Sequence, residues 1–344
     1  MGQTKPKVSA AALARLLGVS PAAVSYALHG RPGVSDELRR RILTAATEYG
    51  VPVPEDGSAL DSAVLGLILA DVLNPFYSEL AISVTDAARG QGYEVFLSNS
   101  RDEERSVAAA VEAMIQHEVD GVLITAIQSG DAGVFRPLRA ARIPFVQISR
   151  RSIHADADFV GIDDRAAGRE IMEHVVGDGH RRIAIVAGPV SSTASKARAD
   201  GFRSTLQAHG LPLERHWNLT GGLNEADGAR AAHYLLDQRA LPQAIVCGTD
   251  AIALGVIGVL ATKGLMVPED VAVTGFDGLT TARTHLVDLT TIVQPRTHMA
   301  AEAIALVTER RHHAQLAPRA ITCPHHLYIG RSCGCRPRKE KQDV

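Results

Sequence analysis

The stretch that decides the fold of the N-terminal region covers residues 8–50 and reads VSAAALARLLGVSPAAVSYALHGRPGVSDELRRRILTAATEYG. Ser9 and Ser20 each precede a short apolar segment. Serine is a preferred residue at a helix N-terminus because its hydroxyl accepts a bond from a free backbone N–H. Gly18 lies between the segments and supplies the left-handed conformation that ends a helix. These caps and breaks predict three helices, over 10–17, 21–28 and 36–49.

Two short helices joined by a tight glycine turn form a helix-turn-helix when the residues at their crossing are small or apolar. Ala14, Gly18 and Val24 meet this condition. The N-terminal part of the second helix then enters the major groove of DNA. The alternative is three helices of an ordinary bundle. From the helix-turn-helix interpretation we expect DNA contacts from Ser20, Pro21, Ala22, Ser25, Tyr26, His29 and Arg31.

Charge is unevenly distributed along the chain. Residues 1–50 hold seven Lys/Arg and three Asp/Glu, a net charge of +4. Residues 51–330 carry −9 and residues 331–344 carry +3, within a total of −2. The consecutive arginines at 39–41 are either phosphate contacts or part of a solvated helix face. A basic head on an acidic body indicates that only the head approaches a polyanion.

From residue 64 onward, short apolar runs alternate with helix-periodic segments. The predicted strands are 64–70, 93–98, 121–125, 144–149, 183–188, 243–247 and 271–276. The predicted helices are 77–91, 101–118, 165–177, 198–209, 227–236 and 251–264. This alternation is typical of parallel, doubly wound sheets covered by helices on both faces. A body of about 270 residues has room for two such sheets, the second beginning near Gly161, with a cleft between two lobes.

Polar residues gather at the predicted strand ends, where open α/β sheets bind their ligands. Carboxylates, amides and aromatic rings suit a polyhydroxylated small molecule, because each hydroxyl needs a hydrogen-bond partner once it loses water. The alternative for Asp163, Asp250 and Asp277 is that they cap the following helices. The candidate ligand-binding residues are Asn74, Phe76, Arg150, Asp164, Arg198, Asp250, Asp277 and Gln294.

Support for catalysis is limited to one motif. Residues 330–334 read G-x-S-x-G, but a nucleophile elbow needs later Asp and His partners, and no histidine follows. The sequence has no P-loop and no G-x-G-x-x-G motif. We therefore expect no enzyme activity, no cofactor and no metal. The C-terminal cysteines and histidines match no standard zinc spacing; they are Cys323, His325, His326, Cys333 and Cys335.

The sequence also bears on the compartment. The longest apolar stretch, 251–262, has 12 residues, whereas a membrane-spanning helix needs about 20. The N-terminus turns polar too soon for a secretory signal. Four cysteines in 344 residues are too few for a disulfide framework. These features predict a cytoplasmic protein without a membrane segment.

Several motifs occur in a fixed order after the helix-turn-helix stretch. They are NPFYSEL (74–80), GHRRIAIVAGP (179–189), TDAIALG (249–255), GLMVPEDVAVTGFD (264–277) and LTTIVQP (289–295). Together they resemble the lactose repressor (LacI/GalR) family of bacterial transcription regulators, over nearly the whole chain. The resemblance implies a core like that of periplasmic sugar-binding proteins, a dimer and a palindromic operator. It places effector contacts on Phe76, Arg198, Asp277 and Gln294, and also on Arg150, Asp164 and Asp250.

The sequence departs from this family in its second helix. Tyr26 stands where the family often has arginine, and His29 where it often has asparagine. Both positions are among those expected to read bases in the major groove. The preferred operator half-site therefore does not carry over from the family.

A second departure lies in the linker. Family members typically have a basic hinge helix whose leucine wedges into the minor groove. Residues 51–64 instead contain three carboxylates and no basic residue, with Leu60 as the candidate wedge. This hinge either docks weakly, because carboxylates are repelled by phosphates, or serves as a flexible tether.

The predicted organisation is a helix-turn-helix domain over 1–50, a linker or hinge over 51–63, a two-lobed effector-binding and dimerisation domain over 64–332, and a basic tail over 333–344. We interpret the chain as a nucleoid-associated repressor, a homodimer or a tetramer. A sugar or related polar metabolite would control its affinity for double-stranded operator DNA. The alternative is a solute-binding protein without a DNA function, but such a protein needs an export signal and has no use for the basic head.

Overall fold

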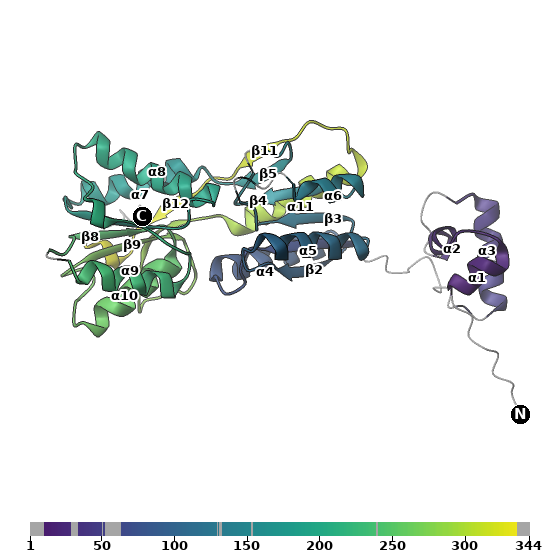
Figure 1. The fold of residues 1–344 in the computed structure, drawn as a ribbon, viewed down its shortest axis with the longest axis horizontal. Coiled ribbons are helices and arrows are strands. Elements are labelled where there is room, and N and C mark those ends of the chain that lie inside the picture. Colours follow the sequence, from purple (N-terminus) through teal and green to yellow (C-terminus); the bar gives the residue numbers. More distant parts are fainter. Residues whose placement is uncertain are drawn as a thin grey trace, which may run out of the picture. The chain divides into compact units, whose positions relative to one another are not determined.

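The computed structural model describes residues 10–28, 34–49, 51, 63–128, 130, 133–152, 154–238 and 240–335. Internal contacts divide the chain into two units, Met1–Ala63 and Val64–Val344. Figure 1 shows that the first unit is helical, whereas the second combines helices with sheets. The two units are called the head and the body.

The head consists of α1 (Ala10–Leu17), α2 (Pro21–Leu28) and α3 (Asp36–Glu48). Gly18 ends α1 with a φ of 67°, and the Ser20 hydroxyl accepts a hydrogen bond from the N–H of Ala23 at the start of α2. The prediction of a helix-turn-helix head is confirmed. Its buried core comprises Leu13, Ala14, Val24, Ala27, Ile42, Ala45, Ala46 and Val51.

Two of the three consecutive arginines of α3 stabilise the ends of the other helices. Arg39 donates to the carbonyl of Tyr26 at 3.3 Å, and Arg41 donates to that of Leu17 at 3.0 Å. The last carbonyls of a helix have no partner within the helix, so these bonds satisfy groups that would otherwise need water. Contact between these arginines and phosphate stays a prediction.

The body contains two six-stranded sheets, which define lobe 1 and lobe 2. The sheet of lobe 1 has the order β11-β5-β4-β3-β1-β2, with strands β1 (Ala63–Leu69), β2 (Tyr93–Asn99), β3 (Gly121–Ile124), β4 (Phe145–Ile148), β5 (Asp158–Gly161) and β11 (Ala320–Thr322). The sheet of lobe 2 has the order β12-β10-β9-β8-β6-β7, with strands β6 (Ile183–Ala187), β7 (Asn218–Thr220), β8 (Ala244–Cys247), β9 (Ala272–Asp277), β10 (Thr290–Val293) and β12 (His326–Tyr328). The prediction of two largely parallel sheets is confirmed, and β10 and β12 pair in the antiparallel direction.

Helices cover both sheets. In lobe 2, α7 (Asp164–Gly177) packs with α8 (Thr193–Ala208) on one face, and α9 (Glu225–Leu236) packs with α10 (Asp250–Thr262) on the other (Figure 1). In lobe 1, α4 (Pro75–Arg89) packs with α11 (Arg296–His312), and α5 (Glu104–Gln116) packs with α6 (Phe135–Ala140). The large apolar side chains between these layers form the core of each lobe.

The chain passes between the lobes three times. It leaves lobe 1 after β5, returns from β10 to α11, and crosses again between β11 and β12. The second lobe therefore begins close to Gly161, as the sequence predicts. The sequence did not predict five of the strands and two of the helices in the described residues; these are β5, β7, β10, β11, β12, α6 and α11. In the described part of the chain, no helix is both long and apolar enough to cross a bilayer.

Candidate functional site

Each sheet reverses its strand order at one point, and these two points locate the candidate site. The reversal lies between β1 and β3 in lobe 1 and between β6 and β8 in lobe 2. In open α/β sheets, ligands bind in the crevice beyond the carboxyl ends of the strands at such a point. The segments that follow the strands meet across the lobes, since the Asn74 side chain donates to the carbonyl of Leu223 at 3.2 Å.

Arg198 on α8 forms the centre of the lobe 2 side. Its Nε donates to Asp164 Oδ1 at 2.7 Å, and its Nη1 donates to Asp277 Oδ1 at 3.1 Å and to the carbonyl of Gly248 at 2.9 Å. The guanidinium carbon lies 3.8 Å from the centre of the Phe276 ring. Arginine provides a planar set of donors that can satisfy several acceptors at once. The side chain is thus fixed in position by four residues from three different segments, α7, β9 and the loop after β8.

Arg150, just after β4, forms the lobe 1 side. Its Nη1 bonds both carboxylate oxygens of Asp102 at 2.8 Å, and its guanidinium carbon lies 5.5 Å from the centre of the Tyr77 ring. Each lobe therefore presents a buried arginine with a carboxylate and an aromatic ring. This combination suits a polar ligand that also has apolar faces.

Burial changes the ionisation of the acids in lobe 2. It raises the pKa of Asp277 to about 6, although Arg198 and a hydrogen bond from Gln294 act in the opposite direction. It also raises the pKa of Asp164 against the effect of Arg198. Removal of water from a carboxylate disfavours its charged form, which is the physical cause in both cases. A ligand that donates hydrogen bonds to these oxygens would favour the ionised form.

The cleft is closed in this conformation. The Thr193 hydroxyl bonds both the N–H and the carbonyl of Arg151 across the lobes, and Glu79 on α4 forms an ion pair with Arg296 at 2.7 Å. Openings of about 540 Å³ beside Glu79 and Gln294 and of about 490 Å³ beside Arg151 and Asp164 flank the centre of the cleft. The space between the two buried arginines is about 20 Å³, room for one water molecule. It is lined by Asn74, Phe76, Tyr77, Ser149, Arg150, Ser192, Ala194, Ser195, Arg198, Leu223, Thr249 and Asp277.

Five of the eight predicted effector residues line this space: Asn74, Phe76, Arg150, Arg198 and Asp277. Two others, Asp164 and Gln294, bond these residues and line the openings that flank this space. Asp164 holds Arg198, and the Gln294 amide donates to Asp277 Oδ1 at 2.8 Å. Effector contact at each of these residues stays a prediction.

Asp250 lies outside the cavity lining and is fully buried. Its carboxylate accepts from the Thr291 hydroxyl at 2.6 Å and from the N–H of Leu279 at 2.7 Å. Among the alternatives raised by the sequence, Asp163 does cap α7, because its side chain accepts from the N–H of Ala166. The cap of α10 is Thr249 rather than Asp250.

Sequence reasoning missed Asp102, which holds Arg150. Asp102 follows the end of β2 by three residues and has a φ of 59°. The rule that ligand sites lie beyond strand ends would have indicated it, because β2 was correctly predicted over 93–98. Ser192 and Ser195 were also missed, and Ser192 caps α8.

In the head, the structure describes the side chains of only two predicted DNA contacts. Tyr26 on α2 is 38% exposed and Ser20 is also exposed. Pro21, Ala22 and Ser25 lie in α2, and only their backbones are described. His29, Arg31 and Leu60 lie outside the described residues. The second helix therefore offers an accessible aromatic side chain that can donate and accept hydrogen bonds.

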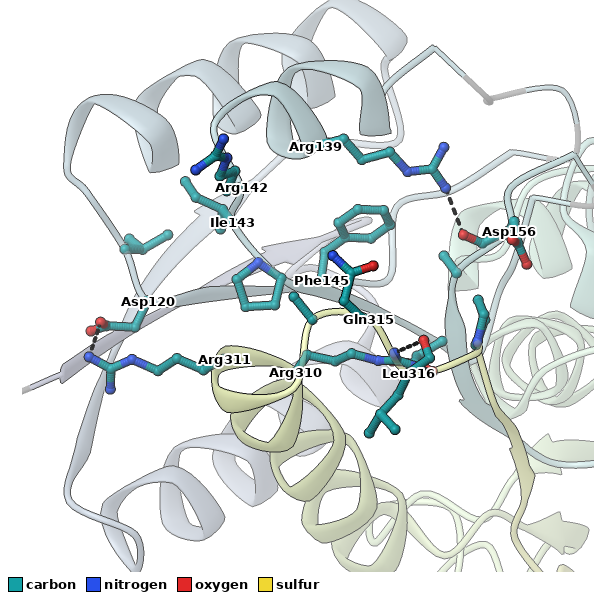
Figure 2. Close-up of a pocket in the computed structure, with 16 residues that line it drawn as sticks. Asp120, Arg139, Arg142, Ile143, Phe145, Asp156, Arg310, Arg311, Gln315 and Leu316 are labelled. Atoms are coloured by element: carbon teal, nitrogen blue, oxygen red, sulfur yellow. Dashed lines mark hydrogen bonds and ion pairs between the residues drawn. The ribbon is translucent and has the colours of Figure 1, made fainter.

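A second, larger cavity of about 590 Å³ lies at the amino ends of strands β3, β4 and β5 (Figure 2). Three of the arginines that line it have partners within the lobe. Arg311 forms an ion pair with Asp120 at 2.6 Å, Arg310 forms one with Asp158, and Arg139 donates to the carbonyl of Asp156. Ligands of open α/β sheets bind at the opposite edge, so the cleft between the lobes is the better candidate despite its small volume.

Residues 62–330 match the family described as periplasmic binding proteins and sugar-binding domain of the LacI family. The HTH-type transcriptional repressor PurR of Glaesserella parasuis is 29% identical over 301 residues, which cover 87% of this chain and 88% of that protein. The ribose operon repressor of Escherichia coli is also 29% identical, over 87% of this chain and 91% of its own length. Among solved structures, the complex of the transcriptional regulator CelR with cellobiose has a TM-score of 0.72 at 27% identity, covering 94% of this chain and 99% of that one.

Proposed function

This chain belongs to the family of periplasmic binding proteins and LacI-type sugar-binding domains and is a transcription repressor of that kind; we propose that a sugar or related polar metabolite controls it from the cleft between the lobes. The observation that carries the proposal is the pair of buried arginines, Arg150 and Arg198, one from each lobe. A ligand that bonds both would set the distance between the lobes. The relatives are repressors, and binding without catalysis is part of the proposal.

The chemistry of the lining favours a carbohydrate-like effector. Asp277 can accept hydrogen bonds from the hydroxyl groups of a ligand. Asn74 can both donate hydrogen bonds to them and accept hydrogen bonds from them. Arg198 uses Nε and Nη1 for its bonds within the described residues, which leaves Nη2 as a donor to a ligand. The Phe76 ring can cover an apolar face of a sugar ring. The solved relative CelR is a complex with cellobiose, which is consistent with this class of ligand.

The control mechanism rests on lobe movement. Ligand pockets usually measure about 300–1,000 Å³, whereas the centre of the cleft, between Arg150 and Arg198, leaves about 20 Å³. The effector therefore binds a more open arrangement, and the three crossings between the lobes act as the hinge. In a homodimer or tetramer, a change in lobe arrangement alters how two heads meet the half-sites of a palindromic operator. A difference in effector affinity of about 1–3 kcal/mol between arrangements changes operator occupancy 5- to 150-fold.

The linker and the compartment complete the proposal. Residues 51–63 join the head to the body and are acidic, so we propose that they tether the head without adding phosphate contacts of their own. A repressor of this kind acts in the cytoplasm, where the operator lies. The runner-up is a solute-binding protein, and the helix-turn-helix head with its net charge of +4 argues against it.

The decisive experiment is a binding titration of the full chain against DNA from its own upstream region. It uses excess competitor DNA at about 150 mM salt, where non-specific binding is weak, and a panel of sugars. The proposal expects tight binding that one sugar alters and that deletion of residues 1–60 abolishes. Sugar binding by the full chain without any specific DNA binding would favour the solute-binding alternative.

Two variants test the effector cleft and the DNA-binding helix independently of each other. Arg198→Lys keeps the charge but cannot reach Asp164, Asp277 and Gly248 together. It should weaken the effector response about 10- to 100-fold and leave operator affinity unchanged. Arg203→Lys is the matched control on the same helix, because Arg203 contacts only exposed groups. An unaltered response in Arg198→Lys would contradict the assignment of the cleft.

The second variant tests the head. Tyr26→Ala removes an exposed side chain of α2 and should weaken specific DNA binding about 10-fold or more, while non-specific binding changes little. Equal losses in both kinds of binding would show that α2 does not read the operator. The measurement is the same titration with operator and with unrelated DNA.

A further inference from the structure

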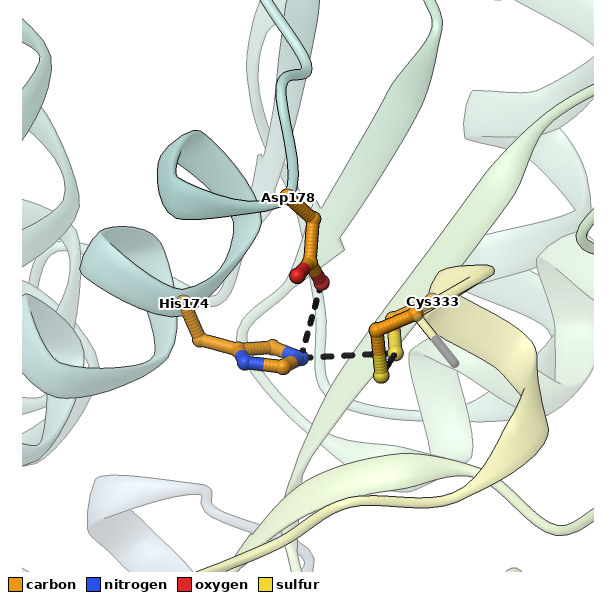
Figure 3. Close-up of side chains that lie close together, drawn as sticks. His174, Asp178 and Cys333 are labelled. Carbon is orange, nitrogen blue, oxygen red and sulfur yellow. Dashed lines mark hydrogen bonds and ion pairs between the residues drawn. The ribbon is translucent and has the colours of Figure 1, made fainter. Parts of the chain in front are cut away.

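Four side chains with metal-binding atoms meet at the C-terminal end of α7, on the far side of lobe 2 from the cleft. They are His174, Asp178, Cys333 and Cys335, and one donor atom from each lies within 4.8 Å of all the others. His174 Nε2 is 3.3 Å from Cys333 Sγ and 3.1 Å from Asp178 Oδ2 (Figure 3). The two sulfurs are 2.8 Å apart. The proposed function of the cleft uses none of these residues.

The backbone explains why these side chains converge. His174 and Asp178 are four residues apart at the end of α7, so they lie on one face of the helix. Cys333 and Cys335 flank Gly334, whose φ of 80° turns the chain so that both thiols point the same way. The two pairs are separated by 159 residues from His174 to Cys333. Spacing within the C-terminal segment alone could not show the site, because half of its ligands come from α7.

We propose that lobe 2 binds one zinc ion through His174, Asp178, Cys333 and Cys335. Two thiolates, an imidazole and a carboxylate are a donor set that selects zinc over magnesium or calcium. Tetrahedral zinc places two sulfurs about 3.8 Å apart and a nitrogen about 3.6 Å from a sulfur, from bond lengths of about 2.3 and 2.0 Å. The two sulfurs are 2.8 Å apart and His174 Nε2 is 3.3 Å from Cys333 Sγ, so the thiols must separate by about 1 Å to admit the ion.

The surroundings of Cys333 hold it in place for such a role. Ser332 is the residue before Cys333. Its hydroxyl donates to the carbonyl of Val273 at 2.6 Å and accepts from the N–H of Thr290 at 2.9 Å. His180 Nε2 lies 3.2 Å from the carbonyl of Cys333. The segment is thus bonded to β9 and β10, and zinc would link α7 to both strands. Four protein ligands leave no open position, which is typical of a structural site rather than a catalytic one.

The other C-terminal candidates lie elsewhere. Cys323 is buried in the apolar core next to β11, and His325 Nε2 is 3.0 Å from a carboxylate oxygen of Glu170. Cys323 therefore provides a matched control, because it is a buried thiol of the same region outside the cluster.

The test uses the full-length protein, reduced with a phosphine, freed of metal with a chelator and then titrated with zinc against a chromophoric chelator. We expect one zinc ion per chain, with release of the two thiol protons. The cobalt-loaded protein should show the visible bands of a tetrahedral centre together with thiolate-to-cobalt charge transfer. A reduced protein that takes up no zinc overturns the proposal. A Cys333–Cys335 disulfide in the isolated protein, combined with no zinc uptake after reduction, would identify a redox pair instead.

Variants assign the ligands. Cys335→Ser alters a partly exposed residue and Asp178→Asn keeps the shape of the side chain, so neither disturbs the core of the lobe. Each should weaken zinc binding by about 100-fold or more, since even loss of a partner behind a ligand costs 10- to 100-fold. Zinc should raise the Tm of the natural protein and of Cys323→Ser, but not that of Cys335→Ser. Equal zinc affinity in all of these proteins would contradict the assignment.

Discussion

The two lobes hold their cleft arginines in different ways. In lobe 2, Arg198 has two carboxylate partners, Asp164 and Asp277, and all three side chains are buried. In lobe 1, Arg150 has one partner, Asp102, whose side chain is 28% exposed. Lobe 2 therefore carries excess negative charge away from water, whereas lobe 1 carries a balanced pair near it. The difference indicates that lobe 2 is preorganised for ligand binding at a cost in stability, and that lobe 1 adapts more easily.

Replacement of each cleft arginine should give the largest difference between the lobes, measured as the loss of unfolding free energy. Arg198→Met leaves two buried carboxylates without a counter-charge, and breaking a buried pair costs about 3–5 kcal/mol of unfolding free energy. Arg150→Met leaves only the partly hydrated Asp102, so we expect a loss of about 1–2 kcal/mol. Urea denaturation of both variants at pH 7 measures the two values. Equal losses would mean that the two faces of the cleft do not differ in the way described.

Sequence patterns predicted those parts of the molecule that depend on local signals. Gly18 and Ser20 mark the ends of the first two head helices, and the fully buried strands of both sheets are apolar runs. Helix α11 was not predicted, although its N-terminus lacks a side-chain cap just as that of the predicted helix α5 does. Strands β7, β11 and β12 have three residues each with mostly exposed or partly exposed side chains, so they lack an apolar run.

The sequence could predict which residues line the cleft, but not which side chains bond to one another there. Asn74, Phe76, Arg150 and Asp277 follow strand ends, and parallel strands bring such ends to one edge. The partnership of Arg150 with Asp102 joins residues 48 positions apart, and that of Arg198 with Asp277 joins residues 79 apart. No local pattern encodes these pairs, because they depend on how helices pack onto the sheets.

A second prediction concerns the change of unfolding free energy with pH, to which buried acids of lobe 2 contribute. Burial raises the pKa of Asp250 to about 7 and that of Asp277 to about 6, against about 3.9 for an unfolded aspartate. The folded protein therefore holds these protons more tightly than the unfolded chain. The stabilisation is fully present below about pH 4 and is lost as the pH rises through the folded-state values. Stability should fall by about 3–4 kcal/mol between pH 5 and pH 7.

Asp250→Asn removes one of these titrations. The amide can still accept from the N–H of Leu279 and can donate to the Thr291 hydroxyl, so the local bonds remain. The variant should lose less stability than the natural protein between pH 5 and pH 7, as measured by urea denaturation at several pH values. A profile that is unchanged from that of the natural protein would show that Asp250 is ionised in the folded state.

The smallest expected effect lies where the two lobes meet. Glu79 on α4 forms an ion pair with Arg296 at 2.7 Å and accepts from the N–H of Thr280 at 3.1 Å. Arg296 in turn donates to the carbonyl of Asp277, so this contact joins lobe 1 to the preorganised face of lobe 2. Glu79→Gln keeps the bond from Thr280 and removes the ion pair. For a partly exposed pair we expect a loss of about 1 kcal/mol from the closed arrangement, a shift of about fivefold toward the open one.

Small-angle scattering of the protein without effector should then report a larger radius of gyration for Glu79→Gln, and the apparent affinity for the effector should rise by up to about fivefold. The rise is expected because less free energy is lost in opening the cleft before the ligand enters. Glu112→Gln is the matched control, since Glu112 is an exposed glutamate on α5 of the same lobe. If Glu79→Gln instead weakened effector binding with no change in scattering, the ion pair would belong to the ligand-bound arrangement, and the closed cleft would not be the state that opposes binding.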